Sequence, residues 1–549
     1  MRTLYENGRV YTGQLPLTEA FVVEDGRFVF AGGAEQARLA AGPEAQVVDL
    51  EGAFVCAGFN DSHMHLLNYG YALQVADLSS HTGSLAEVLD TMRAFLKEKN
   101  FAPGQWVRGR GWNHDYFTDE QRFPTRQDLD QVSREHPVCI VRTCGHTCVV
   151  NTKALEMIGV TAATPQPEGG CFEIGPDGQP NGVFRENGME LVYSKLPKPS
   201  VEDLKTMLLD AQKHLNAYGV TSCQTDDFDA FATVDWREVM EAYAQLEAEG
   251  KMTVRMYQQA QLTSVKALEE FFAEGYNTGW GDEWVKVGPL KILGDGSLGA
   301  RSAYLSRDYA DKPGYRGIAI YTQQQFDDLI GCANEHGMQV AVHTIGDGIL
   351  DRVLESYEKA LAEHPRADHR HGVVHCQITR PDQLKKIEEM GLHVYAQPIF
   401  LDYDIHMVTD RVGEELASTS YAFRTLMDAG VWVSSGTDCP VELPRALACI
   451  QCAVTRSTLK GDAGPYRPEE AFTVQQAIDS YTIHAAHASF EENEKGRIAP
   501  GYLADFVVLG QDPFAADPAA IQNIPVKAVY VGGKCVHQAY KHTKRTCSH

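Results

Sequence analysis

The sequence predicts an α/β protein built from parallel βα units, arranged as a barrel or a doubly wound sheet, with a small additional β domain. Apolar strand-like runs alternate with helix-like stretches through the middle of the chain, and strands that alternate with helices pair in parallel. Both ends of the chain consist instead of short β-prone runs with tight turns. A small β domain made from both termini is therefore expected.

The β-rich ends carry local turn signals. An Asn-Gly pair in residues 4–12 and an Asp-Gly pair in residues 20–33 each lie between β-prone runs, which predicts a hairpin at each place. The final part of the chain returns to the same character. We therefore assign residues 1–57 and 498–549 to one β domain, and we expect the basic stretch 537–549 to be poorly ordered.

The middle of the chain alternates between two kinds of segment. Its strand-like runs include residues 137–145, 338–347, 371–376 and 431–438. Its helix-like stretches include residues 201–219, 348–364 and 380–391. Because βα proteins place their chemistry at the carboxyl ends of their strands, residues at these ends are the candidates for a functional site.

Composition excludes several classes of protein. With 49 Lys+Arg against 74 Asp+Glu, the formal net charge is −25, and such a surface repels the phosphates of nucleic acids. No apolar run reaches the length of about 18 residues that a membrane helix needs. The N-terminus lacks a secretory pattern and the 13 cysteines are scattered, which favours the cytoplasm. Cys449 and Cys452 fall in a helix-like segment, where we expect buried thiols.

Two histidines provide the sharpest chemical signal. His63 and His65 stand in residues 58–70, where the β-rich N-terminal part ends. Side chains at positions i and i+2 of a strand point to the same side, so both imidazoles could reach one metal ion. Zinc, iron and nickel all accept neutral imidazole. The alternative for such a pair on its own is two satisfied or exposed histidines.

Four further residues follow strand-like runs. His343, His375 and Asp438 each end such a run, and Lys291 lies in another. A desolvated lysine can react with carbon dioxide to give a carbamate, an anionic ligand able to bridge two metal ions; the alternative is a salt-bridged or exposed lysine. Taken one by one, the histidines suit structural roles. Taken together at strand ends in this order, the residues favour a metal site.

The sequence resembles the amidohydrolase superfamily over nearly its whole length. Residues 23–33 and 47–66 look like the usual opening of the superfamily, and residues 496–513 look like its usual closing. One branch contains N-substituted formamide deformylase and many uncharacterised metal-dependent hydrolases. The segments that resemble this branch are residues 145–155, 181–187, 290–303, 343–347 and 434–444.

The resemblance implies a (β/α)8 TIM-type barrel over residues 58–497, with an insertion at about 75–205, and a composite β-sandwich from both termini. It implies one or two divalent metal ions per chain, with zinc favoured. Asp438 takes the place of the last-strand aspartate, which is both a ligand and a proton carrier. The implied metal ligands are His63, His65, Lys291 as a carboxylated lysine, His343, His375 and Asp438.

This sequence departs from the branch at Val374, where a glutamate usually precedes the histidine of the sixth strand. The change alters either the contacts around that ligand or the substrate preference. Alanine also replaces the usual proline at position 57, which we regard as a minor difference.

Several other residues are candidates for contact with the substrate. The resemblance suggests that His146 lies at the mouth of the active site and meets the substrate; the alternative is a loop histidine. Trp112 and His114 are candidate substrate-binding residues of a pocket lid, or else an aromatic core anchor and its neighbour. Arg301, after the lysine-containing run, either holds an anionic group of the substrate or braces its own loop.

Two pairs of neighbouring charged residues remain open between functional and structural roles. Arg185 and Glu186 either bind substrate or form an ion pair, with the structural role favoured. Asp226 and Asp227 end another strand-like run, where they would orient metal ligands through hydrogen bonds.

These residues predict metal-assisted hydrolysis of a small molecule. A bound metal lowers the pKa of its water from 15.7 to about 7 and so supplies hydroxide near neutral pH. Asp438 would accept a proton and return it to the departing nitrogen, while His146 would stabilise the oxyanion. The favoured substrate is an N-substituted amide or formamide, cleaved at a non-peptide C–N bond. The alternatives are a deaminase or cyclic-amide hydrolase of the same superfamily, and a non-catalytic scaffold protein; a homodimer is the default assembly.

Overall fold

The computed structural model describes residues 2–80, 83–144 and 146–539. The chain forms two compact units. The barrel unit consists of Met1–Asn68 and Leu204–His549, and the inserted unit consists of Tyr69–Asp203. The predicted insertion at about 75–205 falls in the part of the chain that the inserted unit occupies. Of the basic stretch expected to be poorly ordered, residues 540–549 lie outside the described residues.

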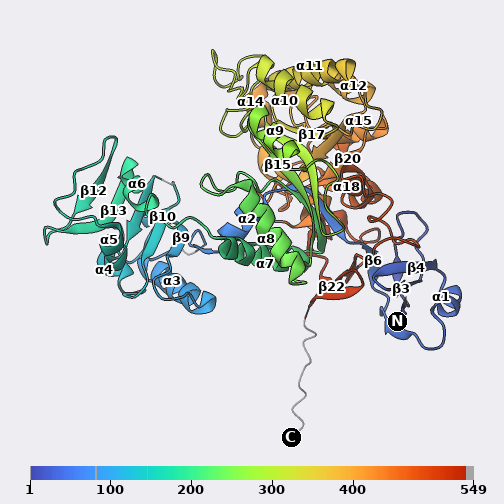
Figure 1. Cartoon of the computed structure of the whole chain (residues 1–549), viewed down its shortest axis with the longest axis horizontal. Coiled ribbons are helices and arrows are strands. Elements are labelled where there is room, and N and C mark those ends of the chain that lie inside the picture. The colour runs from blue at the N-terminus through green and yellow to red at the C-terminus, as the bar shows by residue number, and fades with distance from the viewer. Residues whose placement is uncertain (1, 81–82, 145, 540–549) are drawn as a thin grey trace, which may run out of the picture. The chain divides into compact units, whose positions relative to one another are not determined.

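The barrel unit contains a sheet of eight parallel strands, which confirms the predicted fold class. Neighbouring strands pair in chain order from first to last, and helices cover the outside of the sheet (Figure 1). The strands are β7 (Phe59–Met64), β14 (Val220–Thr225), β15 (Arg255–Gln261), β16 (Val285–Leu293), β17 (Val340–Thr344), β18 (Gly372–His375), β19 (His393–Ala396) and β20 (Val433–Ser435).

Hydrogen bonds between the first strand and the segment after the last strand close the barrel at its carboxyl end. The amide of Asp438 donates to the carbonyl of His63 at 2.9 Å, and the amide of His65 donates to the carbonyl of Cys439 at 2.7 Å. Asp61, on β7, accepts hydrogen bonds from both the amide (3.0 Å) and the hydroxyl (2.5 Å) of Thr437. The two edges of the sheet therefore meet at the residues that the sequence singles out.

The outer helices follow from amphipathic patterns with caps. In α10 (Gln323–Glu335), the buried residues Phe326, Leu329, Ile330 and Ala333 recur at the spacing of one helix face. Thr322 caps this helix through the amide of Gln325 and forms a capping box with it. Other helices of the layer are α7 (Val201–Ala217), α8 (Trp236–Ala248), α9 (Val265–Ala273), α11 (Asp347–Glu363), α12 (Pro381–Glu389), α16 (Ala446–Thr455), α17 (Val474–Ser480) and α18 (Ile483–Ala488). Cys449 and Cys452 are buried in α16, as expected.

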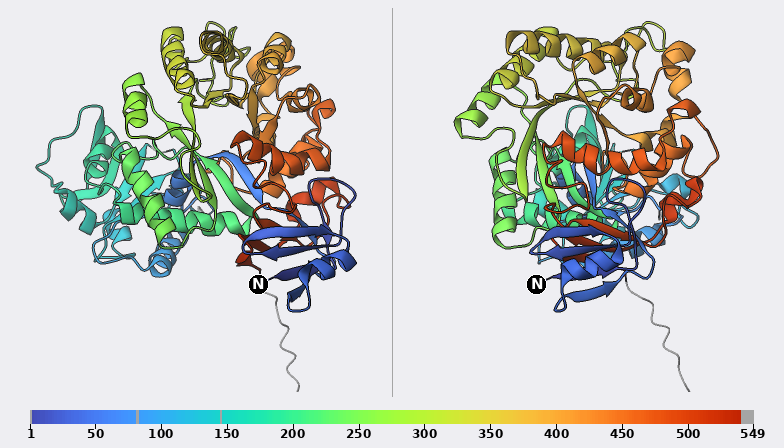
Figure 2. Two further views of the ribbon diagram at one scale, coloured as in Figure 1. Left: turned by 45° about the vertical axis from the view of Figure 1, so that its right-hand side comes forward. Right: turned by 90° about the vertical axis from the view of Figure 1, so that its right-hand side faces the viewer.

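Both ends of the chain build two sheets that share an aromatic core. Figure 2 shows the blue N-terminal strands beside red C-terminal ones. One sheet has the order β4-β3-β1-β5 and the other the order β2-β6-β21-β22-β23. The bounds are β1 (Thr3–Glu6), β2 (Arg9–Val10), β3 (Ala20–Glu24), β4 (Arg27–Gly32), β5 (Gln46–Asp49), β6 (Phe54–Ala57), β21 (Phe506–Leu509), β22 (Val526–Val531) and β23 (Lys534–Gln538). Phe21 and Phe506 pack edge to face at 5.0 Å, which joins strands from the two termini.

One of the two predicted hairpins is wrong. The Asp-Gly pair does join β3 to β4 as an antiparallel hairpin. The Asn-Gly pair turns the chain between β1 and β2, with Asn7 in a left-handed conformation (φ 57°), but the two strands lie in different sheets. β1 pairs with β3 and β5, whereas β2 pairs with β6. The local turn signal was right, and the choice of sheet depended on residues far along the chain.

The inserted unit contains a six-stranded sheet of order β12-β13-β11-β10-β9-β8. These strands are β8 (Val75–Asp77), β9 (Val107–Trp112), β10 (Val138–Arg142), β11 (Thr147–Val150), β12 (Gly170–Ile174) and β13 (Pro180–Glu186), and the longest helix is α3 (Leu85–Lys99). Trp112, Leu129 and Ile140 belong to its core. No helix in the described parts of the chain is both long and apolar enough to span a membrane.

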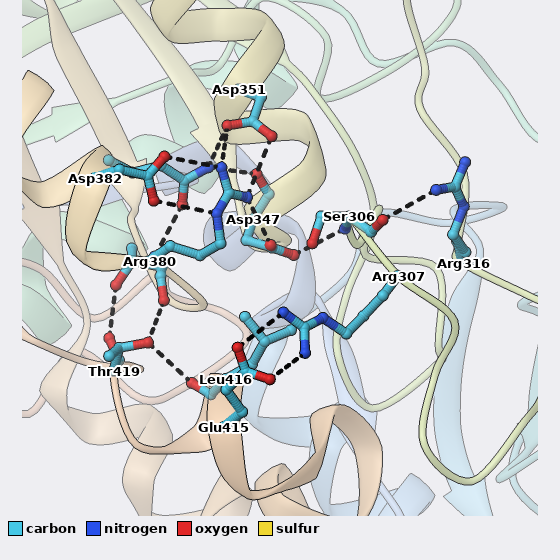
Figure 3. A network of polar contacts seen from close by, with 12 residues as sticks. Ser306, Arg307, Arg316, Asp347, Asp351, Arg380, Asp382, Glu415, Leu416 and Thr419 are labelled. Atoms are coloured by element: carbon cyan, nitrogen blue, oxygen red, sulfur yellow. Dashed lines mark hydrogen bonds and ion pairs between the residues drawn. The ribbon is translucent and has the colours of Figure 1, made fainter.

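A network of ion pairs fastens the long loop between β16 and α10 (Figure 3). Arg380 pairs with Asp347 at 2.8 Å and with Asp351 at 2.7 Å, so it ties the start of α12 to α11. Asp347 in turn accepts a 2.9 Å hydrogen bond from the amide of Ser306 in the loop. The loop that follows the Lys291 strand is thereby held against the neighbouring βα units.

Candidate metal centre

The centre begins with the histidine pair that ends the first barrel strand. His63 lies in β7 and is buried, and His65 follows the end of this strand. Their rings lie 5.3 Å apart between centroids, on the same side of the strand as the i, i+2 spacing requires. Nε2 of His63 and Nε2 of His65 lie 3.3 and 3.0 Å from the same carboxylate oxygen of Asp438.

Asp438 therefore connects the first and last strands of the barrel through its side chain as well as its backbone. Its backbone adopts a left-handed conformation (φ 58°), which is uncommon for a non-glycine residue and is concentrated at functional sites. Single donor atoms of His63, His65 and Asp438 all lie within 4.8 Å of one another.

Lys291 and Asp226 form a buried ion pair on the adjacent side of the centre. Nζ of Lys291 lies 2.9 Å from Oδ2 of Asp226, and both side chains are fully inaccessible to solvent. The other oxygen of Asp226 contacts Nδ1 of His65. Asp226 follows β14, so three different strands supply this part of the centre.

His343 and His375 end β17 and β18 and complete the set. Nε2 of His375 lies 2.9 Å from Nδ1 of His343, and the ring of His375 lies 5.6 Å from that of His63. All six predicted ligand positions are thus brought to one site at the carboxyl end of the barrel. Each of them lies within three residues of the carboxyl end of a strand of the same parallel sheet.

The structure adds three residues that sequence reasoning missed. Gln259 contacts Nδ1 of His63 at 2.9 Å, and Gln397 contacts Nδ1 of His375 at 2.7 Å. Asp295 lies 3.3 Å from Nε2 of His343 and also accepts hydrogen bonds from the amides of Ile345 and Gly346. Gln259 and Gln397 lie in no motif, whereas Asp295 lies in the lysine-containing segment 290–303 but was not singled out there.

The protonation of the centre follows from burial and from its carboxylates. Burial lowers the pKa of His65, but Asp226 and Asp438 outweigh burial and raise this pKa to about 10. Burial also lowers the pKa of His63 and of His375, which keeps both rings neutral. Burial raises the pKa of Asp438, yet its contacts with His63 and His65 hold it well below its usual range.

This donor set fits a divalent transition metal. Neutral imidazole nitrogens and a carboxylate oxygen are the ligands that zinc takes in catalytic sites. Buried carboxylates that are ionised at neutral pH also need compensating positive charge. Among the described residues of the centre, Lys291 and a protonated His65 balance the charges of Asp226 and Asp438, so the types of ligand, and not a missing charge, support the metal.

The valine before His375 is explained by strand alternation. Val374 is fully buried in a small apolar cluster with Ala341, Tyr395 and Ala488. Neighbouring residues of a strand face opposite ways, so this side chain packs into the helix layer while His375 faces the centre. A glutamate in the same place would lie among these apolar groups.

Two predicted substrate-binding residues lie in the core of the inserted unit or next to it. Trp112 is completely buried in this unit's hydrophobic core. His114 packs on the ring of Phe123, with 4.1 Å between the ring centroids, and lies 3.5 Å from Asp115. These positions agree with the structural alternative, and a role in substrate binding stays a prediction for both.

His146 and Arg301 have charged partners. Nδ1 of His146 lies 2.9 Å from the carboxylate of Glu186, and both side chains are mostly exposed, at 69% and 58%. Arg185 instead pairs with Glu173 at 2.8 Å, in agreement with its structural role. Arg301 pairs with Asp311 of its own loop at 2.8 Å. The ion pair of Arg301 agrees with bracing of this loop.

Comparison with known proteins supports the class that the fold and site define, a (β/α)8-barrel protein with a metal centre at the carboxyl end of its strands. Residues 46–537 match the model of the amidohydrolase family. The chain belongs to this family, and it is a hydrolase of the corresponding superfamily.

Relatives of known sequence or structure align over almost the whole chain. YtcJ of Bacillus subtilis (strain 168) is 32% identical over 543 residues, which is 98% of this chain and 100% of that protein. N-substituted formamide deformylase of Arthrobacter pascens is 29% identical over 544 residues, 96% of each chain. The crystal structure of an uncharacterized metal-dependent hydrolase from Pyrococcus furiosus is 27% identical and has a TM-score of 0.76, covering 94% of this chain and 100% of that one.

Proposed function

We propose that this protein is a metal-dependent amidohydrolase that cleaves a non-peptide C–N bond in an N-substituted amide or formamide. The observation that carries the proposal is the position of Asp438, one carboxylate oxygen of which lies 3.3 Å from His63 and 3.0 Å from His65. A carboxylate in contact with two candidate ligands is suited to bind metal and to carry a proton. The likeness to N-substituted formamide deformylase supports this choice of bond.

The metal would be held by residues of the barrel unit. His63, His65 and Asp438 offer one group of donor atoms, and His343 and His375 offer another. Lys291, as a carbamate, would provide an anionic oxygen between the two groups. When bound, a divalent ion such as zinc lowers the pKa of water toward neutrality and polarises the substrate carbonyl.

Asp438 would move the proton that the reaction requires. Hydrolysis adds water oxygen to the carbonyl carbon and breaks the bond from that carbon to nitrogen, giving an acid and an amine. Asp438 takes a proton as the new C–O bond forms and gives it to the departing nitrogen, so one side chain serves as base and then as acid. Its lowered pKa means that it is ionised at neutral pH.

The proposal also covers the stabilisation of the oxyanion, the number of metal ions, and the location and partners of the protein. His146, oriented by its contact with Glu186, is proposed to donate a hydrogen bond to the substrate oxyanion. We further propose one or two zinc ions per chain, a cytoplasmic location, a small-molecule substrate and a homodimer, with no nucleic-acid or membrane partner.

The test is metal analysis of the purified protein together with assays on a matched panel of substrates. The panel contains N-substituted formamides, larger N-substituted amides, cyclic amides and amino-substituted rings. We expect bound divalent metal, and amine release from the first two groups. Ammonia release from the ring compounds would instead identify a deaminase, and opening of cyclic amides a cyclic-amide hydrolase. Protein that binds no metal and hydrolyses nothing would refute the proposal and favour a scaffold.

A further inference from the structure

We propose that Gln259 and Gln397 are positioning residues that set the tautomers of His63 and His375, and that the two glutamines differ in how many tautomers they allow. Gln259 locks His63 into the tautomer that presents Nε2 to a metal, whereas Gln397 permits either tautomer of His375. This inference rests on the proposed metal centre and concerns how the chain prepares its ligands for metal binding.

The case for Gln259 rests on two contacts made by one carboxamide. Its Nε2 donates a 3.2 Å hydrogen bond to the carbonyl oxygen of Ser62, and its Oε1 lies 2.9 Å from Nδ1 of His63. Because a carbonyl only accepts, the first contact determines which end of the amide faces His63. An oxygen facing Nδ1 requires the ring proton to be on Nδ1.

The free lone pair of His63 therefore lies on Nε2. This nitrogen faces Asp438, with 3.3 Å between Nε2 and the carboxylate oxygen. Gln259 and His63 are both buried, at 0% and 1% exposure, so no bulk water competes for these contacts. The ring is thus oriented for metal before metal arrives.

The contacts of Gln397 leave more freedom. Its Oε1 lies 2.7 Å from Nδ1 of His375, but its Nε2 is buried without a hydrogen-bond partner among the described residues. Nε2 of His343 lies 3.1 Å from the carbonyl oxygen of Gly296, so this nitrogen carries the proton and Nδ1 of His343 has the lone pair. That lone pair faces Nε2 of His375 at 2.9 Å.

Two arrangements of protons satisfy these distances. With Oε1 of Gln397 toward His375, the proton is on Nδ1 and two lone pairs face each other, an arrangement that a cation between them would stabilise. With the amide turned over, Gln397 donates to Nδ1 and His375 donates from Nε2 to His343, which closes that nitrogen to metal. A carboxamide serves both arrangements, because it can donate or accept.

Glutamate substitutions separate these roles, because both add the same charge beside a ligand. In Gln397→Glu the acceptor toward His375 is kept and no hydrogen bond is lost, so only the metal-binding tautomer is favoured. In Gln259→Glu the donor to Ser62 is lost and an oxygen faces the carbonyl. A carboxylate partner also raises the basicity of a metal-bound imidazole.

The experiment measures the affinity of the full-length, metal-stripped protein for Zn²⁺ alone, by competition with a chromophoric chelator. We expect Gln259→Leu and Gln397→Leu to weaken binding about 10–100-fold. We expect Gln397→Glu to bind Zn²⁺ more tightly than the wild type, and Gln259→Glu more weakly. Gln224→Leu is the matched control, since Gln224 is buried on the barrel strand β14 and donates to the carbonyl of Ala485 at 2.7 Å.

The outcomes are distinguishable from those of the proposed function. Wild-type protein that takes up no Zn²⁺ refutes the metal centre itself. Wild-type protein that binds Zn²⁺ while both leucine variants bind it equally well overturns the positioning roles. Equal tightening by the two glutamate variants would show an effect of charge alone and overturn the difference between Gln259 and Gln397. Thermal unfolding of each variant without metal identifies any loss that reflects folding.

Discussion

The backbone amide of Asp438 donates a 2.9 Å hydrogen bond to the carbonyl oxygen of His63. His63 belongs to the first strand of the barrel sheet, and Asp438 follows the last strand. Closing the sheet and assembling the proposed metal ligands are therefore one event. We call the hydrogen bonds between the first strand and the segment after the last strand the seam of the barrel. A change that breaks this seam should disturb the chemistry even when it leaves every ligand in place.

Asp438→Asn tests the proton carrier. The amide keeps an oxygen toward His63 and His65 but cannot accept and return a proton. We expect kcat on an N-substituted formamide to fall about 10²–10⁴-fold. The melting temperature serves as the control for folding. A variant as active as the wild type would exclude Asp438 as the proton carrier.

Thr437→Val tests the seam without touching a predicted ligand. The hydroxyl of Thr437 donates to Asp61 at 2.5 Å, and burial raises the pKa of Asp61 to about 7. Removing the donor leaves a buried carboxyl oxygen short of a partner, at a cost of about 1–3 kcal/mol. We expect a lower melting temperature and weaker metal retention, while Thr437→Ser should restore both. Unchanged stability and metal content in the valine variant would contradict the role of the seam.

Lys291→Arg tests the carbamate. Arginine keeps a cation for Asp226 but does not form a stable carbamate. Wild-type protein exposed to ¹³C-labelled bicarbonate and metal should show a carbamate carbon signal by NMR, and Lys291→Arg should show none and retain less metal. If the arginine variant keeps full activity and metal, Lys291 acts as the partner of Asp226 alone.

Asp479→Asn tests a buried carboxyl outside the metal centre. Burial raises the pKa of Asp479 to about 6, an effect that the hydrogen bond from Tyr11 partly offsets. A carboxyl with a raised pKa in the folded state contributes stability while protonated, in full below about pH 4, and this contribution is lost as pH rises through about 6. The asparagine variant should therefore gain about 1–2 kcal/mol over the wild type at pH 7 and nothing near pH 4.

Melting temperatures across this pH range measure the gain at Asp479. Asp410→Asn, at an exposed position, is the control and should show no trend with pH. A constant difference between Asp479→Asn and the wild type from pH 4 to pH 7 would contradict the raised pKa.

The sequence was most informative where a local pattern decides the outcome. His63 and His65 share one side of a strand because of their spacing alone, and His343 and His375 lie near each other because consecutive βα units pair in parallel. The ion pair between Lys291 and Asp226 could not be predicted from the sequence, because it depends on which side chains meet inside the barrel.

Contacts between distant residues account for the remaining failures. Gln259 and Gln397 carry no motif, and a buried glutamine next to a ligand cannot be told from any other glutamine by sequence. The Asn-Gly turn at Asn7 was recognised, but its flanking strands separate into two sheets because β1 pairs with β3 and β5, whereas β2 pairs with β6. Turn chemistry acts over a few residues, whereas sheet membership is decided over the whole chain.

The pairing of β6 with β21 has a consequence for the synthesis of the protein on the ribosome. Roughly 450 residues separate the two strands, so at about 5–20 residues per second the ribosome needs on the order of 20–90 s to deliver the partner of β6. During that time the apolar strand Phe54–Ala57, fully buried in the finished fold, has an open edge. The nascent chain thus carries an unpaired apolar strand near its N-terminus through most of its synthesis. A chain released from a ribosome that stalls before β21 is therefore prone to aggregate.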